Sequence, residues 1–211
     1  MNIACVLKVQ KSKNAIYTTE WVDKLYRGVK RNLDTKFNFY CLTNVETKYD
    51  DIPLTSESDG FWNKIELFKK DLFQGPTLYL DLDVVICNNI TNLVYNMRRH
   101  KFLMTKEPYK QISNSSIMFW IGDYSYLYNN YIADQKNICA EYSRVPRYGD
   151  QAYIAENVNH NFVEEIDPTA INWKHHEVKT EINNPKFLIF TSKHQKPSNN
   201  KDLKIVRKNW I

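Results

Sequence analysis

The segment GPTLYLDLDVVICNN, residues 75–89, indicates the fold class of the chain. Its centre, residues 78–86, is an apolar run that a Gly-Pro pair precedes, which is typical of a central strand in a parallel sheet. Two carboxylates, Asp81 and Asp83, interrupt this run. Carboxylates are almost never buried without a partner. The segment therefore predicts a buried strand whose two acids bind something.

Strands and helices alternate on both sides of this segment. We expect strands at residues 1–9, 37–43, 78–86, 101–105, 116–121, 162–166 and 186–190. We expect helices at residues 18–32, 61–73, 122–133 and 149–157, with a long polar loop over 44–60 and an irregular tail after His194. This alternation predicts an α/β domain with a mainly parallel, open sheet flanked by helices. Ligands bind outside the carboxyl ends of such strands, where Asp81 and Asp83 lie.

Composition narrows the classes of partner. The 211 residues are 43% hydrophobic and 14% aromatic, which predicts one folded domain. The net charge of +5 suits an anionic substrate, but no long basic run favours a nucleic-acid partner. We expect the dispersed cysteines Cys5, Cys41 and Cys87 to be reduced core residues. Reduced cysteines favour a cytoplasmic location, which would be the cytoplasm of a host cell if the protein is viral. We expect neither a signal peptide nor a membrane span, which would need roughly 18–20 apolar residues.

The spacing of Asp81 and Asp83 favours a metal site. Side chains two residues apart in a strand point the same way, so both carboxylates can reach one hard cation. Such a cation, Mn²⁺ or Mg²⁺, would clamp a diphosphate and neutralise charge that grows on it as it leaves. The alternative is a pair of solvated acids at the end of a strand.

Several segments together resemble one enzyme family. The segment GFWNKIELFKKDLFQGPTLYLDLDVVICNNITNLV, residues 60–94, is similar to the core of metal-dependent GT-A glycosyltransferases, close to the family 8-like enzymes of bacteria and viruses. FNFYCLTN (37–44), SNSSIMFW (113–120) and YGDQAYIAE (148–156) match in the expected order. The resemblance implies transfer of a sugar from a nucleotide-diphosphate sugar, by default a uridine diphosphate sugar, to an unknown glycan, lipid or protein, with retention of configuration. It also implies a single GT-A domain over 1–211, with a nucleotide-binding half over about 1–90 and a sugar and acceptor half over about 91–211.

The resemblance also implies roles for individual residues. Asp81 would lie near the ribose and the metal, and Asp83 would be the main metal ligand. Lys64 would face the donor pyrophosphate, and Tyr17 would hold the nucleobase. The remaining donor and sugar positions are Asn114 and Ser115, which would line the sugar pocket, and Asp150 and Gln151, which would lie against the transferred sugar.

The C-terminal third departs from the family pattern. In FLIFTSKHQKPSN, residues 187–199, Lys196 fits a donor-binding lysine, but the histidine that completes the metal site is out of register. Either His194 is the third ligand from a shifted loop, or water is. Lys174, in the sequence NWKHH, could reach a donor phosphate, and the two histidines after it could be ligands or surface residues.

Other interpretations remain for this sequence. Lys64 could be a solvated helix lysine, Asn114 and Ser115 an ordinary turn, and Asp150 a helix N-cap. The sequence YLDLDVVI also resembles the first motif of haloacid-dehalogenase-like phosphatases, although that motif normally follows the first strand. A degenerate GT-A domain that binds a nucleotide or a sugar without turnover is the other alternative.

Overall fold

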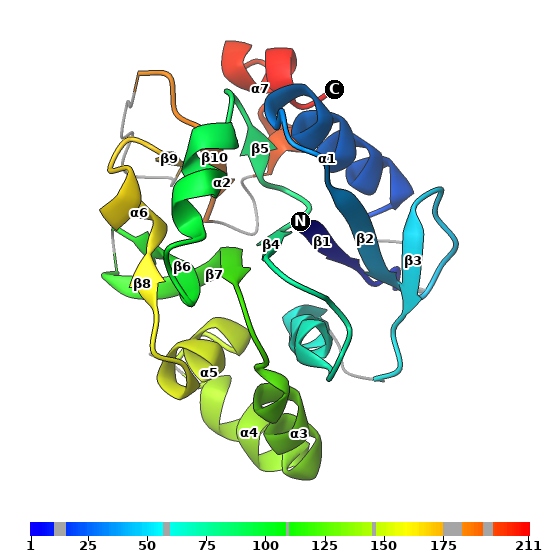
Figure 1. Ribbon diagram of the computed structural model, residues 1–211. Coiled ribbons are helices and arrows are strands. Elements are labelled where there is room, and N and C mark those ends of the chain that lie inside the picture. Colours follow the sequence, from blue (N-terminus) through cyan, green and yellow to red (C-terminus); the bar gives the residue numbers. More distant parts are fainter. Residues whose placement is uncertain (11–15, 57–59, 109, 145–146, 175–182, 192–195) are drawn as a thin grey trace.

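A seven-stranded sheet forms the centre of the protein (Figure 1). The computed structural model describes residues 1–10, 16–56, 60–108, 110–144, 147–174, 183–191 and 196–211. The strands of this sheet are β1 (Asn2–Leu7), β2 (Asn38–Thr43), β3 (Asp50–Pro53), β4 (Thr77–Leu80), β6 (Phe102–Glu107), β7 (Ile112–Trp120) and β8 (Asn161–Phe162), in the order β3-β2-β1-β4-β7-β6-β8. Strands β3, β2, β1 and β4 run parallel, whereas β7 is antiparallel to both β4 and β6, and β8 is parallel to β6.

A second sheet of three strands packs beside the first. It consists of β5 (Val85–Ile86), β10 (Phe187–Phe190) and β9 (Ile171–Lys174), with β10 in the middle. Strand β5 follows β4 within a few residues, so the chain passes from the large sheet to the small one across the turn that contains Asp81 and Asp83. The two acids therefore lie where the sheets meet.

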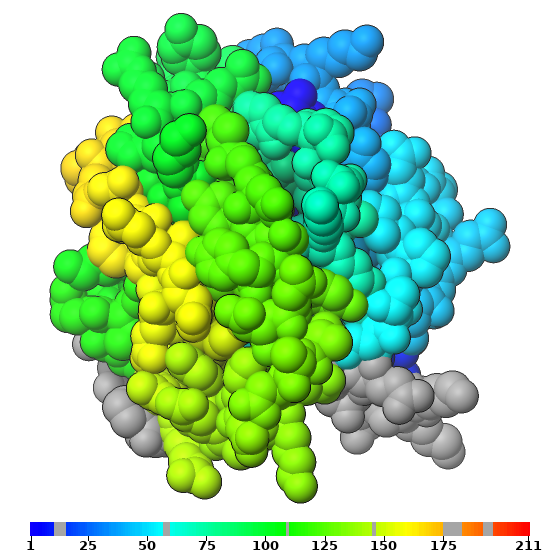
Figure 2. All heavy atoms as spheres, turned by 60° about the horizontal axis from the view of Figure 1, so that its bottom comes forward, coloured from blue at the N-terminus to red at the C-terminus, as the bar shows by residue number. Residues whose placement is uncertain are grey.

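Each face of the large sheet has its own apolar core, because side chains alternate along a strand. Ile3, Cys5 and Leu7 of β1 point to one core, and Ala4 between them points to the other. The first core packs against α1 (Thr19–Asn32), α2 (Thr91–Met97), α6 (Val163–Ile166), α7 (Lys204–Asn209) and the small sheet. The second packs against the 3₁₀ helix η1 (Gly60–Phe68), α3 (Ser125–Ala133), α4 (Gln135–Tyr142) and α5 (Asp150–Asn157). Figure 2 shows the yellow-green helices α3 to α5 covering this second face.

The apolar run at residues 78–86 is two strands rather than the single strand expected. Strand β4 ends at Leu80, and a turn closed by the Val84 N–H and the Asp81 carbonyl (3.1 Å) leads into β5. The aspartates thus stand on a turn, so the alternation of an extended strand does not orient them. The acids can be placed next to a core because the turn brings polar partners to them.

The helix expected at 61–73 is the shorter 3₁₀ helix η1, and every residue from Trp62 to Phe68 is buried. The strand expected at 162–166 is wrong, because β8 ends at Phe162 and α6 follows. The Glu165 carboxylate accepts the Phe162 N–H at 3.2 Å and so starts the helix.

Six elements were absent from the sequence expectations or were assigned to irregular segments. They are β3 in the polar loop, α2, α4, β9, and in the C-terminal tail η2 (Pro197–Asn199) and α7. Strand β3 lies at the edge of the sheet, and none of its four residues is fully buried. Its sequence DDIP therefore lacks the apolar pattern that predicts a strand. No helix in the described part of the chain is long and apolar enough to cross a membrane.

Candidate functional site

A cavity of about 550 Å³ opens at the carboxyl ends of β1 and β4. Its walls come from the segment after β1, the turn after β4, η1, β7, the start of α5 and the segment after β10. The residues from the sequence prediction that line it are Tyr17, Lys64, Asp81, Asp83, Asn114, Ser115, Asp150, Gln151 and Lys196. Residues up to 179 positions apart in the sequence therefore share one concave surface, as expected for the carboxyl edge of an open sheet.

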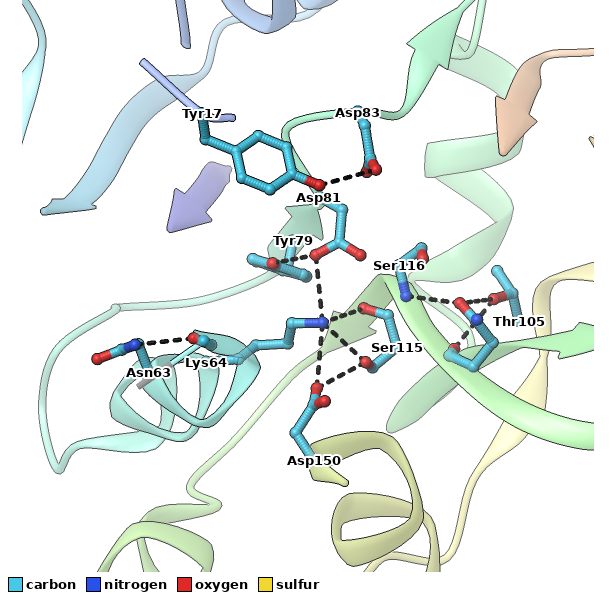
Figure 3. Close-up of polar contacts among 12 residues, drawn as sticks. Tyr17, Asn63, Lys64, Tyr79, Asp81, Asp83, Thr105, Ser115, Ser116 and Asp150 are labelled. Atoms are coloured by element: carbon cyan, nitrogen blue, oxygen red, sulfur yellow. Dashed lines mark hydrogen bonds and ion pairs between the residues drawn. The ribbon is translucent and has the colours of Figure 1, made fainter. Parts of the chain in front are cut away.

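The Lys64 cluster consists of Lys64, Asp81, Ser115 and Asp150 (Figure 3). The Lys64 ammonium lies 3.2 Å from Asp81 Oδ1, 3.1 Å from Asp150 Oδ2 and 2.8 Å from Ser115 Oγ. Ser115 Oγ in turn donates to Asp150 Oδ2 at 2.8 Å. The side chains come from η1, the turn after β4, β7 and α5, so this cluster joins the two halves of the chain.

Burial and charge shift the ionisation of the Lys64 cluster in opposite ways. Burial alone would lower the pKa of Lys64, but the adjacent Asp150 and Asp81 raise it above its usual value. Burial would likewise raise the pKa of Asp81, yet Lys64, the Tyr79 hydroxyl and Ser116 together lower it. Burial raises the pKa of Asp150, and Lys64 and Ser115 offset only part of this. The cluster therefore holds a charged lysine and an ionised Asp81.

The Asp83 cluster consists of Asp83, Tyr17 and Lys196. The Tyr17 hydroxyl donates to Asp83 Oδ2 at 3.1 Å, and the Lys196 ammonium pairs with the same oxygen. Lys196 also lies 5.6 Å from the centre of the Tyr17 ring. Burial, followed by the charges of Asp83 and Asp81, raises the pKa of Tyr17, so its hydroxyl stays protonated and donates. The cluster thus closes one end of the cavity with residues from both ends of the chain.

The predicted sugar-pocket residues Asn114 and Ser115 lie near the start of β7. Asn114 Oδ1 accepts the Ser116 N–H at 2.8 Å, and the Thr105 hydroxyl donates to the Asn114 carbonyl at 3.0 Å. Asn114 and Ser115 are buried parts of a strand, so the ordinary-turn interpretation is wrong. Gln151 lines the cavity from the first turn of α5.

The alternative interpretations of Lys64 and Asp150 are also wrong. Lys64 is 7% exposed and is not a solvated helix lysine. Gly149 precedes α5 as its N-cap, with φ +70°, and Asp150 is the first helical residue. The Asp150 carboxylate points to Lys64 and Ser115 instead of capping the helix.

One predicted residue does not line the cavity, and another lies outside the described part of the chain. Lys174 ends β9, where its carbonyl accepts the Thr191 N–H at 3.2 Å, and it is not among the described residues that line the cavity. His194 lies outside the described residues, as do His175 and His176. Both assignments stay predictions.

The sequence prediction missed Tyr79, whose hydroxyl donates to Asp81 Oδ1. Tyr79 stands two residues before Asp81, but Asp81 follows the end of β4 on a turn, so strand alternation alone could not bring the two side chains together. Phe61 and Tyr148, which also line the cavity, were missed as well. Both lie inside segments that match the family, Phe61 in 60–94 and Tyr148 in 148–156, but an exposed ring there has no periodicity that would single it out.

The donor set suits a divalent cation. Tyr17 and Lys196 use Oδ2 of Asp83, and Lys64 and Tyr79 use Oδ1 of Asp81, which leaves one oxygen of each carboxylate outside these contacts. Carboxylate oxygens are the ligands that Mg²⁺ and Mn²⁺ prefer. Within the described ranges, no group of three or more His, Cys, Asp or Glu side chains could hold a metal, so further ligands would come from other sources.

The dehalogenase-like alternative does not suit the chain order. The acidic turn follows β4, after three other strands of the same sheet, rather than the first strand. The motif therefore occupies a different place in the topology from the one that this alternative needs.

Comparison with known proteins gives no match in sequence and clear matches in structure. No protein-family profile matches the sequence, and no curated protein is significantly similar to it. The galactosyltransferase LgtC, solved with donor and acceptor sugar analogues, matches with a TM-score of 0.63 at 12% identity, over 100% of this chain and 97% of that one. The glycosyltransferase GlyE of Streptococcus pneumoniae matches with a TM-score of 0.65 at 12% identity, over 94% of this chain and 56% of that one.

A viral enzyme also matches. It is a glycosyltransferase involved in glycosylation of the major capsid of PBCV-1, with a TM-score of 0.55 at 14% identity, over 96% of this chain and 98% of that one. At such identities the likeness concerns the fold. The mixed, mainly parallel sheet flanked by helices is therefore the GT-A fold that these glycosyltransferases share.

Proposed function

We propose that the protein is a metal-dependent glycosyltransferase that moves a sugar from a nucleotide-diphosphate sugar to a glycan, lipid or protein acceptor. The observation that carries the proposal is the placement of the Lys64 cluster and the Asp83 cluster in one cavity at the carboxyl edge of the sheet. A uridine diphosphate sugar is the first donor to test. We place the enzyme in the cytoplasm, because the buried Cys5, Cys41 and Cys87 suit a reducing compartment.

Charge is the argument for a cation. The two clusters contain three carboxylates, Asp81, Asp83 and Asp150, but only two lysines, Lys64 and Lys196. A third lysine, Lys8, also lines the cavity, so its described lysines and carboxylates balance. A nucleotide diphosphate would add negative charge that these lysines do not balance. Asp81 and Asp83 would hold Mn²⁺ or Mg²⁺, and His194 or water would complete the ligands. When bound, the cation would neutralise charge on the departing diphosphate.

Four side chains would bind the donor or hold the site in place. Lys196 and Lys174 would bind the donor phosphates as point charges. Lys64 would keep Asp81 and Asp150 in fixed positions and supply positive charge beneath the diphosphate. Tyr17 would stack against the nucleobase while its hydroxyl holds Asp83.

The transferred sugar would lie at the other end of the cavity. Asn114 and Ser115 would bind its hydroxyl groups, and Asp150 and Gln151 would stabilise the positive charge that develops at its anomeric carbon. The bond from the anomeric carbon to the diphosphate breaks, a bond to the acceptor hydroxyl oxygen forms, and the released nucleotide takes up the hydroxyl proton. We propose retention of configuration, with no enzyme nucleophile assigned.

Donor hydrolysis tests the proposal. Purified protein, Mn²⁺ and a panel of nucleotide sugars should release nucleotide diphosphate from one donor, and chelation should stop the release. Asp83→Ala should lower the rate by about a hundredfold or more, as loss of a charge-assisted contact at a reacting centre does. Asp202→Ala, at an exposed acid on the C-terminal segment, is the matched control and should match the wild type.

A second candidate is binding of a nucleotide or a sugar without turnover. Its support is that Lys64 and Lys196 already neutralise aspartates in the absence of a ligand. Metal-dependent binding of a nucleotide sugar, with no release from any donor even when acceptors are added, would favour this candidate over the transferase. Absence of both binding and turnover would contradict both candidates.

A further inference from the structure

We propose that Phe61 and Tyr148 form an aromatic platform that binds the ring of a saccharide acceptor beside Gln151. The inference rests on the proposed function and narrows its acceptor to a carbohydrate. In the described part of the chain, the large apolar side chains that are exposed include Phe61 (50%) and Tyr148 (37%), and both line the cavity. Contact of apolar rings with water is unfavourable, and a ligand that covers the rings removes this unfavourable contact.

Phe61 is held against the start of α5. Its ring lies on Gly149, so closely that a Cβ on that glycine would come within 2.1 Å of the ring. Gly149 also has a positive φ of +70°, which favours glycine. The ring centre lies 5.6 Å from that of Trp62, the first of the buried residues in η1. Phe61 is therefore seated on fixed backbone while half of its surface faces out.

Tyr148 is held from a different direction. The Lys110 ammonium lies 4.1 Å from the centre of the Tyr148 ring and 3.9 Å from Glu107 Oε1 at the end of β6. A cation over one face of a ring stabilises its orientation. Tyr148 directly precedes Gly149, so the two rings flank the short segment that leads into Asp150 and Gln151.

The position of these rings favours the acceptor over the nucleobase. Asp83 and its partner Tyr17 lie on one side of Lys64, and Asp150 lies on the other (Figure 3). Phe61 belongs to the Asp150 side through its contact with Gly149, and Tyr148 through its place next to Gly149 in the chain. A donor whose diphosphate lies near Asp81 and Asp83 would place its sugar toward Asp150, so what meets the two rings is the group that attacks the sugar.

A saccharide has the chemistry that suits this end of the cavity. One face of a pyranose ring presents C–H groups that pack on aromatic rings, and its edge presents hydroxyl groups for amides such as those of Gln151 and Asn114. A flexible aliphatic chain would use the rings but not the amides. The combination of exposed rings and adjacent amides therefore favours a carbohydrate.

The test measures saccharide binding directly. Saturation-transfer NMR with methyl glycosides of glucose, galactose and N-acetylglucosamine, and with their disaccharides, should identify one that binds the wild type. Phe61→Leu and Tyr148→Leu should each raise its dissociation constant about tenfold, since a ring is replaced by a smaller apolar group. Tyr148→Phe keeps the ring and should stay within about twofold of the wild type. Tyr95→Leu, at a 65% exposed ring on α2, is the matched control.

Kinetics provide the second measurement. With the donor found by hydrolysis, the KM for the saccharide should rise about tenfold more than the KM for the donor in both leucine variants. The inference is overturned if no saccharide binds, if the leucine variants bind as tightly as the Tyr95→Leu control, or if uridine diphosphate alone shifts the Phe61 and Tyr148 ring resonances. Saccharide binding without any donor turnover would support the platform and contradict the transferase, so the two failures are distinguishable.

Discussion

The two lysine-containing clusters of the cavity differ in how firmly the fold holds them. The Lys64 side chain is 8% exposed and contacts two aspartates and a serine from three other elements. The Lys196 side chain is 16% exposed and pairs with Asp83, which Tyr17 also contacts. Lys64 and Asp150 belong to the packed interior, although Asp81 is 26% exposed, whereas Lys196 is the more exposed of the two lysines.

The difference suggests that the lysine–aspartate pairs of the two clusters have different roles. The Lys64 ammonium cannot leave without removing the counter-ion of the buried Asp150 carboxylate, which is costly. Lys196 can leave Asp83 when a cation takes its place, because the Tyr17 hydroxyl still donates to that carboxylate. We infer that the Lys64 cluster builds the site and that the Asp83 cluster rearranges when cation and donor bind.

The largest effect is expected from Lys64→Met. It leaves the buried Asp150 and the partly buried Asp81 without their shared counter-ion, so the free energy of unfolding should fall by about 3–5 kcal/mol. Urea denaturation at neutral pH measures this fall. The double variant with Asp150→Asn should recover part of it, because one buried charge is then removed. Lys70→Met, at an exposed lysine that follows η1, is the control, and a loss as small as the control's would contradict the distinction between the clusters.

Lys196→Met should have a smaller effect on stability and opposite effects on donor binding and metal binding. Loss of the lysine should raise the KM for the donor about tenfold to a hundredfold, because a charged contact to phosphate disappears. The same change should strengthen binding of Mn²⁺ alone, since a positive charge beside Asp83 is gone. Mn²⁺ titration without donor, followed by tryptophan fluorescence, measures the second effect. Weaker Mn²⁺ binding in the variant would mean that Lys196 supports the metal site rather than competing with it.

The smallest effect concerns Glu164, a half-buried acid outside both clusters that has no lysine partner among the ion pairs of the described residues. The Glu164 carboxylate accepts the Lys106 backbone N–H at 3.1 Å, and burial raises its pKa to about 7. In the unfolded chain the Glu164 carboxyl has its ordinary pKa of 4.5 and loses its proton above that pH, whereas the folded protein keeps the proton up to about pH 7. Stability should therefore fall as the pH rises from about 4.5 to 7, by roughly 1–2 kcal/mol.

Glu164→Gln should remove this dependence, because glutamine has no proton to lose. Urea denaturation of both proteins at pH 5 and pH 7.5 measures the difference. An unchanged pH profile in the variant would assign the dependence to another group, with the Lys64 cluster as the next candidate to test.

Much of the site could be predicted from the sequence because its residues lie in short segments of recognisable pattern. Asp81 and Asp83 interrupt an apolar run, and Asp150 and Gln151 follow a glycine, so each stands out locally. Strand β3, helix α6 and the C-terminal helix α7 were missed or misassigned, because edge strands and short helices depend on neighbours rather than on their own periodicity. The same limit applies to Phe61 and Tyr148.

The sequence by itself determined the alternation of strands and helices, the mainly parallel sheet and the position of the two aspartates at its carboxyl edge. These follow from local periodicity, which each segment carries in its own residues. Only the tertiary structure decided that Asp81 and Asp83 stand on a turn between two sheets and that each pairs with a different lysine. Partners so far apart along the chain meet through packing alone, and the energy of a buried charge depends on the partners that packing supplies.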